Sequence, residues 1–148
     1  MMKISKLLCK SFALLSLLLI ACSNTDDIQQ KVTEIDASQL KVRDPFIFYD
    51  ADTDYYYLHV NGTLKVKSYK SKDLLTWQEN GYSFLPSAGF WGKEDFWAPD
   101  FYKYEDKYYL FITLSAPGVK RGTSVLVSDR VTGTFQPLVN NAVTPQEW

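Results

Sequence analysis

The sequence predicts an all-β fold, a β-propeller of which the 148 residues hold about two blades. Three observations support this prediction. Short runs rich in aromatic and β-branched residues alternate with turn-rich segments, and no helical period appears after residue 22. In addition, Tyr56-Tyr57-Leu58 recurs as Tyr108-Tyr109-Leu110, 52 positions later. A repeat of about 50 residues with four short strands is the unit of a propeller, and an unrelated β-sandwich is the alternative.

Each repeat is predicted to hold four strands. The expected strands are 46–49, 55–60, 64–69 and a short one near Trp77, then 101–104, 108–113, 124–128 and 135–138. Propellers close a ring with about four to eight blades. Two blades would leave the ring open and expose apolar faces, so we expect the chain to be the N-terminal part of a longer protein.

The first 21 residues are predicted to be a lipoprotein signal peptide. Three lysines (3, 6 and 10) precede the apolar run 12–21, which is too short for a permanent span of about 20 residues. The run ends in Leu19-Ile20-Ala21-Cys22, which resembles the bacterial lipobox and predicts lipidation of Cys22. An ordinary buried thiol is the alternative.

Residues 22–38 are polar and are predicted to form a tether between the lipid and a domain at 39–148. Asp26-Asp27 resembles the acidic export signals of some lipoproteins. We therefore expect a lipid anchor in the outer membrane or at the cell surface of a Gram-negative bacterium, with the periplasmic side as the alternative. Once Cys9 is cleaved away and Cys22 is acylated, no thiol remains for disulfides or metal sites. A net charge of −1 argues against a nucleic-acid partner.

The segment with the clearest chemical content is Arg43-Asp44-Pro45-Phe46. An acid that precedes a strand and is followed by proline is expected in a rigid extended conformation. The first strand of a propeller blade lines the central axis, so Asp44 would point into an axial pocket. The alternative is that Asp44 pairs with Arg43 or closes a turn.

A second cluster places large rings at positions 90, 91, 96 and 97, just before a predicted strand. These rings could fill the core between blades, or they could stack on the faces of sugar rings. Composition alone leaves both interpretations open.

Taken together, the motifs resemble glycoside hydrolase family 43, five-bladed propellers that cut arabinose- and xylose-containing glycans. The matching segments, in the family's order, are Arg43–Ile47, Tyr56–Leu58, Ser71–Leu74 with Trp77, Phe96–Asp100, Lys107–Phe111, Arg121–Thr123 and Val143–Pro145. The resemblance covers residues 42–148 and implies a polysaccharide or oligosaccharide substrate.

The resemblance also implies roles for individual residues. Family members hydrolyse with inversion, a mechanism in which one carboxylate activates water and another carboxylic acid protonates the leaving oxygen. Asp44 matches the general base, and Trp97 matches an aromatic residue that shapes the sugar pocket. Asp100 is a substrate contact or a structural carboxylate, while Phe46, Phe90 and Trp91 are expected in the pocket wall.

The family's general acid and the aspartate that tunes its pKa would lie beyond Trp148, in later blades. We therefore expect these 148 residues by themselves to be inactive. The residues present suggest no metal or cofactor site, and the axial calcium of some family members would take its ligands from later blades. The alternatives are a non-catalytic glycan-binding lipoprotein and the remnant of a split gene.

Overall fold

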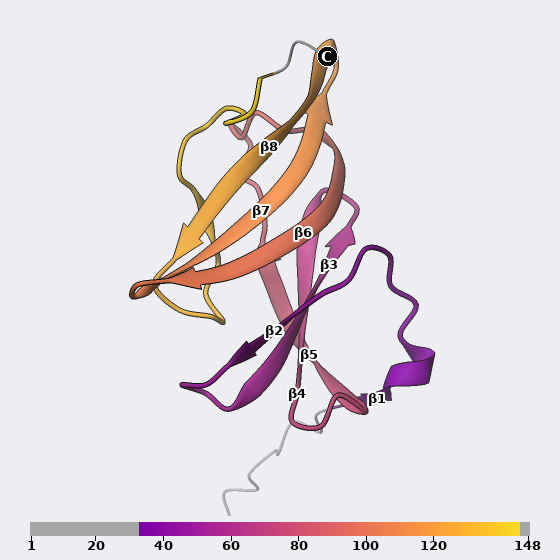
Figure 1. The fold of residues 1–148 in the computed structure, drawn as a ribbon. Helices are drawn as coiled ribbons and strands as arrows, with labels where there is room; N and C mark the ends of the chain where they lie inside the picture. The colour runs from indigo at the N-terminus through magenta and orange to yellow at the C-terminus, as the bar shows by residue number, and fades with distance from the viewer. Residues whose placement is uncertain (1–32, 146–148) are drawn as a thin grey trace, which may run out of the picture. The chain divides into compact units, whose positions relative to one another are not determined.

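Two antiparallel β-sheets make up the part of the chain that the computed structural model describes, residues 33–145 (Figure 1). Sheet A has the strand order β1-β5-β4-β3-β2, and sheet B has the order β6-β7-β8-β9. The strands of sheet A are β1 (Glu34–Asp36), β2 (Phe46–Asp50), β3 (Tyr55–Gly62), β4 (Lys65–Ser71) and β5 (Thr76–Phe84). Those of sheet B are β6 (Glu94–Tyr104), β7 (Lys107–Ala116), β8 (Val119–Ser128) and β9 (Gln136–Pro137). The prediction of an all-β chain is confirmed, and the one helical element described is the 3₁₀ turn Ala37–Gln39.

The strands follow the alternation written in the sequence. Along β7, Tyr108, Leu110, Ile112 and Leu114 are buried while the residues between them are exposed or half-buried. This is the period of two that places successive side chains on opposite faces of a sheet. Turns join the strands locally: Asp50 Oδ2 accepts hydrogen bonds from the backbone N (3.1 Å) and the hydroxyl (2.8 Å) of Thr53, which closes the β2–β3 turn.

The main core lies between the two sheets, where β6 packs across β2 and β3. Phe101 of β6 is central: its ring lies 5.0 Å from that of Phe48 and stacks on His59 at 4.2 Å. The Tyr108 hydroxyl donates to Asp50 Oδ1 at 2.8 Å, which adds a buried polar link between the sheets. Each fully buried large apolar side chain contributes about 1.5–3 kcal/mol, so this interface carries much of the stability.

The outer face of sheet A is covered by the segment that leads into it. Ile35, Ala37, Leu40 and Val42 pack against a second core cluster built on Leu58, Val60, Tyr69 and Trp77. Strand β1 pairs with β5, and the Ala37 amide donates to the Leu75 carbonyl at 2.8 Å. The predicted tether therefore does not extend to residue 38. Residues 34–38 belong to the folded domain because they bury Ile35 and Ala37 and satisfy their backbone groups in the sheet.

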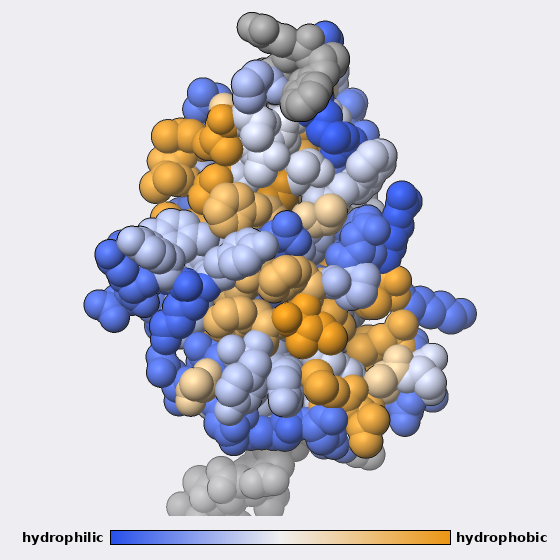
Figure 2. Space-filling view, viewed as in Figure 1, coloured by the Kyte–Doolittle hydropathy of each residue, from blue (hydrophilic) through white to orange (hydrophobic). Residues whose placement is uncertain are grey.

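The outer face of sheet B has no such cover among residues 33–145. Its half-buried or exposed rings include Tyr102, Tyr109 and Phe111, together with Val125 and Val127. Orange apolar patches are visible in Figure 2 over sheet B and, across the middle of the view, over β2 of sheet A. An incomplete ring of blades is expected to leave an apolar face of this kind.

Residues 1–32 lie outside the described part of the chain. The predicted signal peptide, the lipidation of Cys22 and most of the predicted tether fall there and stay predictions. Within residues 33–145, no helix is long and apolar enough to cross a membrane.

Candidate functional site

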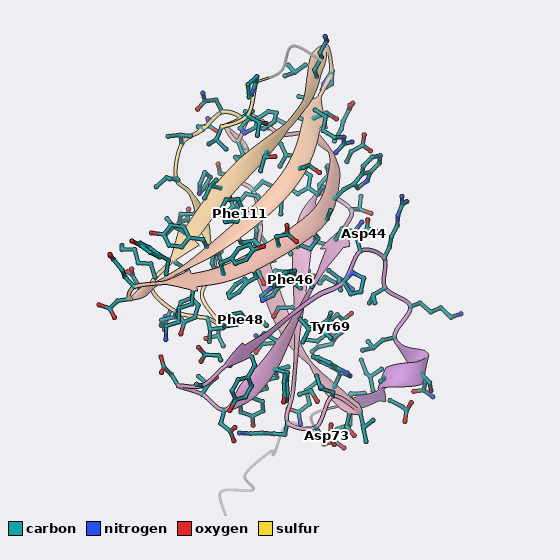
Figure 3. All side chains as sticks on the ribbon, in the orientation of Figure 1. Asp44, Phe46, Phe48, Tyr69, Asp73 and Phe111 are labelled. Atoms are coloured by element: carbon teal, nitrogen blue, oxygen red, sulfur yellow. The ribbon has the colours of Figure 1, made fainter. Side chains whose placement is uncertain are left out.

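Asp44 lies in the segment that enters β2 and is not extended as predicted. Its φ is 49°, in the left-handed region. Aspartate is among the few non-glycine residues that tolerate this region, because its short side chain can form local polar contacts. The side chain is 43% exposed, and Arg43 Nε lies 3.6 Å from Asp44 Oδ2. Figure 3 shows Asp44 on this segment, beyond Phe46 and Phe48 of β2.

Trp97 begins the bent part of β6 and is held by charged groups. The Arg121 guanidinium carbon lies 3.8 Å from the Trp97 ring centroid, and that of Arg43 lies 5.6 Å away. Arg121 is itself fixed, since it donates to both the backbone oxygen and Oδ2 of Asp95 at 2.9 Å. Because Arg43 contacts both Asp44 and the Trp97 ring, it connects two of the predicted site residues.

Strand β6 is irregular at this point, and Pro99 is one physical reason. The pairing of β6 with β7 shifts register between Trp97 and Asp100, and Ala98 has a φ of 48°. Proline has no amide to donate to the ladder and is therefore found at bulges. The bulge turns Trp97 out of the regular alternation and leaves the residue 38% exposed.

Asp100 lies beyond the bulge and does not join the Asp44–Trp97 group through any contact in residues 33–145. It pairs with Phe111 across the β6–β7 ladder and so shares a face of sheet B with that ring. Its carboxylate is exposed on the uncovered outer face. A role for Asp100 in binding substrate stays a prediction.

The remaining predicted pocket residues are placed mainly as core. Phe90 is 1% exposed and packs edge-on against Phe84 at 5.0 Å, so a bound sugar cannot reach it and the pocket-wall prediction is wrong for this ring. Trp91 packs against the same core, and its Nε1 donates to Ser124 Oγ at 2.9 Å. Phe46 packs partly buried against Tyr102, with 5.8 Å between ring centroids. Of the two open interpretations of the aromatic cluster, core filling applies to Phe90 and Trp91.

A cleft of about 760 Å³ is lined in part by Arg43, the residue that precedes Asp44, and Asp44 itself is not in its lining. Its walls come from three segments: residues 41–43, residues 60–65 at the β3–β4 hairpin, and residues 95–97 at the start of β6. Lys67 and Tyr69 of β4 complete the lining. Clefts of roughly 300–1,000 Å³ are typical of small-molecule sites.

Sequence reasoning did not find two features of this site. One is the Asp95–Arg121 clamp on Trp97, whose partners are 26 residues apart. The other is the set of cations around the cleft, two from the segment before β2 and two from β4, which are far apart in the sequence. Among residues 33–145, no group of three His, Cys, Asp or Glu side chains gathers that could hold a metal ion. The predicted axial calcium concerns later blades and is not tested by these residues.

Comparison with known proteins places this geometry in a family. The model of glycosyl hydrolases family 43 matches residues 37–148. The chain belongs to this family. The match begins within the segment that covers sheet A and includes Asp44, Trp97 and the Asp95–Arg121 clamp. No curated protein matches the chain.

Solved structures of three glycan-cleaving enzymes have a similar fold. An endo-arabinase from Bacteroides thetaiotaomicron is 58% identical with a TM-score of 0.76, over 80% of this chain and 42% of that one. An endo-1,4-β-xylanase from the same organism is 26% identical with a TM-score of 0.60, over 77% and 38%. An α-L-arabinanase from Cellvibrio cellulosa, solved with arabinohexaose, is 23% identical with a TM-score of 0.57, over 78% and 38%.

The chain thus spans about two-fifths of the length of these solved structures. The two sheets correspond to part of a propeller, which agrees with the predicted fold class.

Proposed function

We propose that the whole protein is a glycoside hydrolase that acts on arabinose- or xylose-containing polysaccharides and that Asp44 is its general base. The observation that carries the proposal is the position of Asp44. Its exposed carboxylate lies 3.6 Å from Arg43, and Arg43 both lines the cleft and lies against the ring of Trp97. The 58% identity to an endo-arabinase over this region supports arabinan as the first substrate to test.

In the proposed reaction, Asp44 removes a proton from a water molecule as the water oxygen attacks the anomeric carbon of the sugar. The bond from that carbon to the leaving oxygen breaks, and a carboxylic acid from another part of the protein protonates the leaving oxygen. Inversion requires about 6.5–9.5 Å between the two carboxyl groups so that the water fits between them. Trp97 would stack on the sugar, because aromatic faces provide flat apolar contact.

The chain by itself is proposed to be inactive. The acid of family 43 is expected in a later blade, and two sheets do not enclose a pocket. Loss of general-acid assistance typically costs a factor of about 10²–10⁴ in rate. Turnover of aryl arabinosides or aryl xylosides by residues 1–148 alone would contradict this part of the proposal.

The experiment that tests the general base uses the full-length protein and Asp44→Asn. The variant should lose about 10²–10⁴-fold in kcat on arabinan or an aryl arabinoside. Asp52→Asn is the matched control, because Asp52 is an exposed carboxylate at the other end of β2 that pairs with Lys103. If the Asp44 variant keeps full turnover, Asp44 is not the base.

We also propose that the protein is secreted and lipid-anchored through Cys22. The support is the sequence of residues 1–22 alone: a basic start, a short apolar run and the Leu-Ile-Ala-Cys ending. Cys22→Ser should abolish incorporation of labelled fatty acid and move the protein from the membrane fraction to the soluble fraction. Unchanged labelling of the variant would rule out this anchor.

A non-catalytic glycan-binding protein is the second candidate. The observation that favours it is the lining of the cleft, which offers the ring of Trp97 and several charged groups for binding. Under this function, Asp44→Asn would leave glycan affinity unchanged, and no substrate would be cut by the full-length protein.

A further inference from the structure

The cleft beside Asp44 is strongly cationic, although the chain as a whole has a net charge of −1. Four basic side chains line it: Lys41, Arg43, Lys65 and Lys67. Lys41 and Arg43 come from the segment before β2, and Lys65 and Lys67 come from the start of β4. The fold therefore gathers in one place cations that are spread over 27 positions of sequence.

Little negative charge in the cleft balances these cations. Asp95 is the one acidic residue in its lining, and Arg121 binds the Asp95 carboxylate at 2.9 Å. The carboxylate of Asp44, the residue after Arg43, forms an ion pair with Arg43, with 3.6 Å between Asp44 Oδ2 and Arg43 Nε. Lys65 donates to the Tyr82 hydroxyl, a neutral partner, at 3.3 Å. Within residues 33–145, Lys41 and Lys67 form no ion pair, so their charges are available to a ligand.

The cleft also carries aromatic and polar groups suited to a sugar. Trp97 contributes an exposed ring, and Asn61 and Thr63 contribute hydrogen-bonding side chains. A ring that stacks on a sugar, combined with lysines that bind an anion, matches a sugar that bears a carboxylate. Ammonium groups bind carboxylates through charge-assisted hydrogen bonds, and a cationic cleft concentrates anionic ligands.

We propose that this cleft is a binding subsite for a carboxylate-bearing sugar, a uronic acid unit of the glycan. The inference rests on the proposed function, because it deepens the substrate class of the same site. The enzyme would act on arabinose or xylose units that lie near acidic sugars in the polysaccharide. Lys41 and Lys67 bind the carboxylate, while the exposed ring of Trp97 contacts a face of the sugar.

The test is a binding measurement on the full-length protein with Asp44→Asn, so that the neutral sugar is not cut during the measurement. Trigalacturonic acid is the acidic probe, a neutral arabino-oligosaccharide of equal length is the uncharged probe, and a short dextran sulfate tests for charge alone. We expect the acidic sugar to bind at least about tenfold more tightly than the neutral one. Its affinity should also fall on raising salt from about 0.05 to about 0.5 M, because salt screens exposed charges.

Variants locate the binding in the cleft. Lys41→Gln combined with Lys67→Gln should weaken binding of trigalacturonic acid at least about tenfold, whereas the matching Lys→Arg pair should retain it. Lys107→Gln is the control: Lys107 is the first residue of β7, at the end of sheet B away from the cleft, and pairs with Asp129. Circular dichroism checks that each variant is folded.

Three outcomes would overturn the subsite. These are equal affinity for the acidic and neutral sugars, dextran sulfate binding that Lys107→Gln weakens as much as the cleft pair does, and full binding by the Lys41/Lys67 glutamine variant. None of them touches the proposed hydrolysis, which is measured separately on neutral arabinan with the full-length protein. Conversely, loss of arabinan turnover in all assays would leave the binding result standing and remove only the enzymatic proposal.

Discussion

The two sheets are related as repeats, and the comparison separates what belongs to the blade from what belongs to the site. Leu58 of β3 corresponds to Leu110 of β7, so His59 corresponds to Phe111. The ladders pair Phe46 with His59 and Asp100 with Phe111. Phe46 and Asp100 are therefore equivalent, and the residues before them align as Arg43-Asp44-Pro45 and Trp97-Ala98-Pro99.

Both sheets have the same backbone conformation at these equivalent positions. Asp44 has a φ of 49° and Ala98 a φ of 48°, and each precedes a proline. Left-handed backbone at a non-glycine residue is often taken as a mark of a functional site. Its presence in both sheets shows that this turn is part of how a blade begins. Only the side chain differs: an exposed carboxylate in one sheet and a methyl group in the other.

The largest expected effect comes from exchanging these two side chains in the full-length protein. The double variant Asp44→Ala with Ala98→Asp should fold normally, because Ala98 already shows that alanine accepts this conformation. Its activity on arabinan should fall about 10²–10⁴-fold, because the carboxylate no longer lies beside Arg43 and the cleft. Denaturant midpoints and kcat are the measurements. Activity near the wild-type level would show that catalysis does not require a carboxylate at position 44.

The second expected effect concerns His59. Its side chain is buried between the sheets, whereas the side chain of the equivalent residue in sheet B, Phe111, is half-exposed. Burial lowers the pKa of His59 to about 3, because charging the ring there is unfavourable. In the unfolded chain its pKa is about 6.5. Between these values the unfolded chain binds a proton that the folded chain does not. Stability should therefore fall as pH is lowered from about 6.5, by at most about 1.4 kcal/mol per pH unit.

His59→Gln tests this effect, because glutamine does not titrate and can still bond Ser83, which lies 2.8 Å from His59 Nδ1. His59 is the only histidine in the sequence, so the variant should lose most of the pH dependence between about pH 6.5 and 5. Urea unfolding at several pH values measures it. An unchanged pH profile in the variant would assign the acid sensitivity to other groups.

A smaller effect is expected from Ala98→Val. A β-branched residue is strongly disfavoured at positive φ, so the variant should lose about 2 kcal/mol of unfolding free energy. Ala98→Gly should change stability by no more than about 0.5 kcal/mol, because relief of strain offsets the greater freedom of glycine in the unfolded chain. Ala116→Gly, in β7, is the control and should destabilise. Equal effects of valine and glycine at position 98 would argue against the left-handed turn.

The smallest effect is expected from removing the Asp95–Arg121 clamp that holds the ring of Trp97. Sheet A has no equivalent of this clamp among the described residues. Arg121→Gln removes a cation that lies 3.8 Å from the ring, an interaction worth about 0.5–1 kcal/mol at an exposed site. KM on arabinan should rise severalfold in the full-length protein while kcat changes little, because Trp97 positions the sugar and does not transfer protons. Asp95→Asn should act in the same direction, and the two changes should not be additive. A loss confined to kcat would contradict a positioning role.

Much of the fold follows from local pattern. The period-two alternation of β7, the turn residues 50–54 and the repeated Tyr-Tyr-Leu are enough to predict most strands and the division into two repeats. The segment 34–38 escapes this kind of reasoning because its composition is polar. Its apolar residues Ile35 and Ala37 become informative only when the exposed face of sheet A is seen to need cover.

The sequence by itself determined the strands, the family and the candidate base, since these depend on local alternation and on motifs within a few residues of one another. Only the tertiary structure decided that Asp44 is left-handed, that Phe90 is core and that Arg121 holds Trp97. It also brought Lys41, Arg43, Lys65 and Lys67 around one cleft. The physical reason is that contacts between distant segments are set by how the sheets pack, and a single sequence carries no periodic signal of that packing.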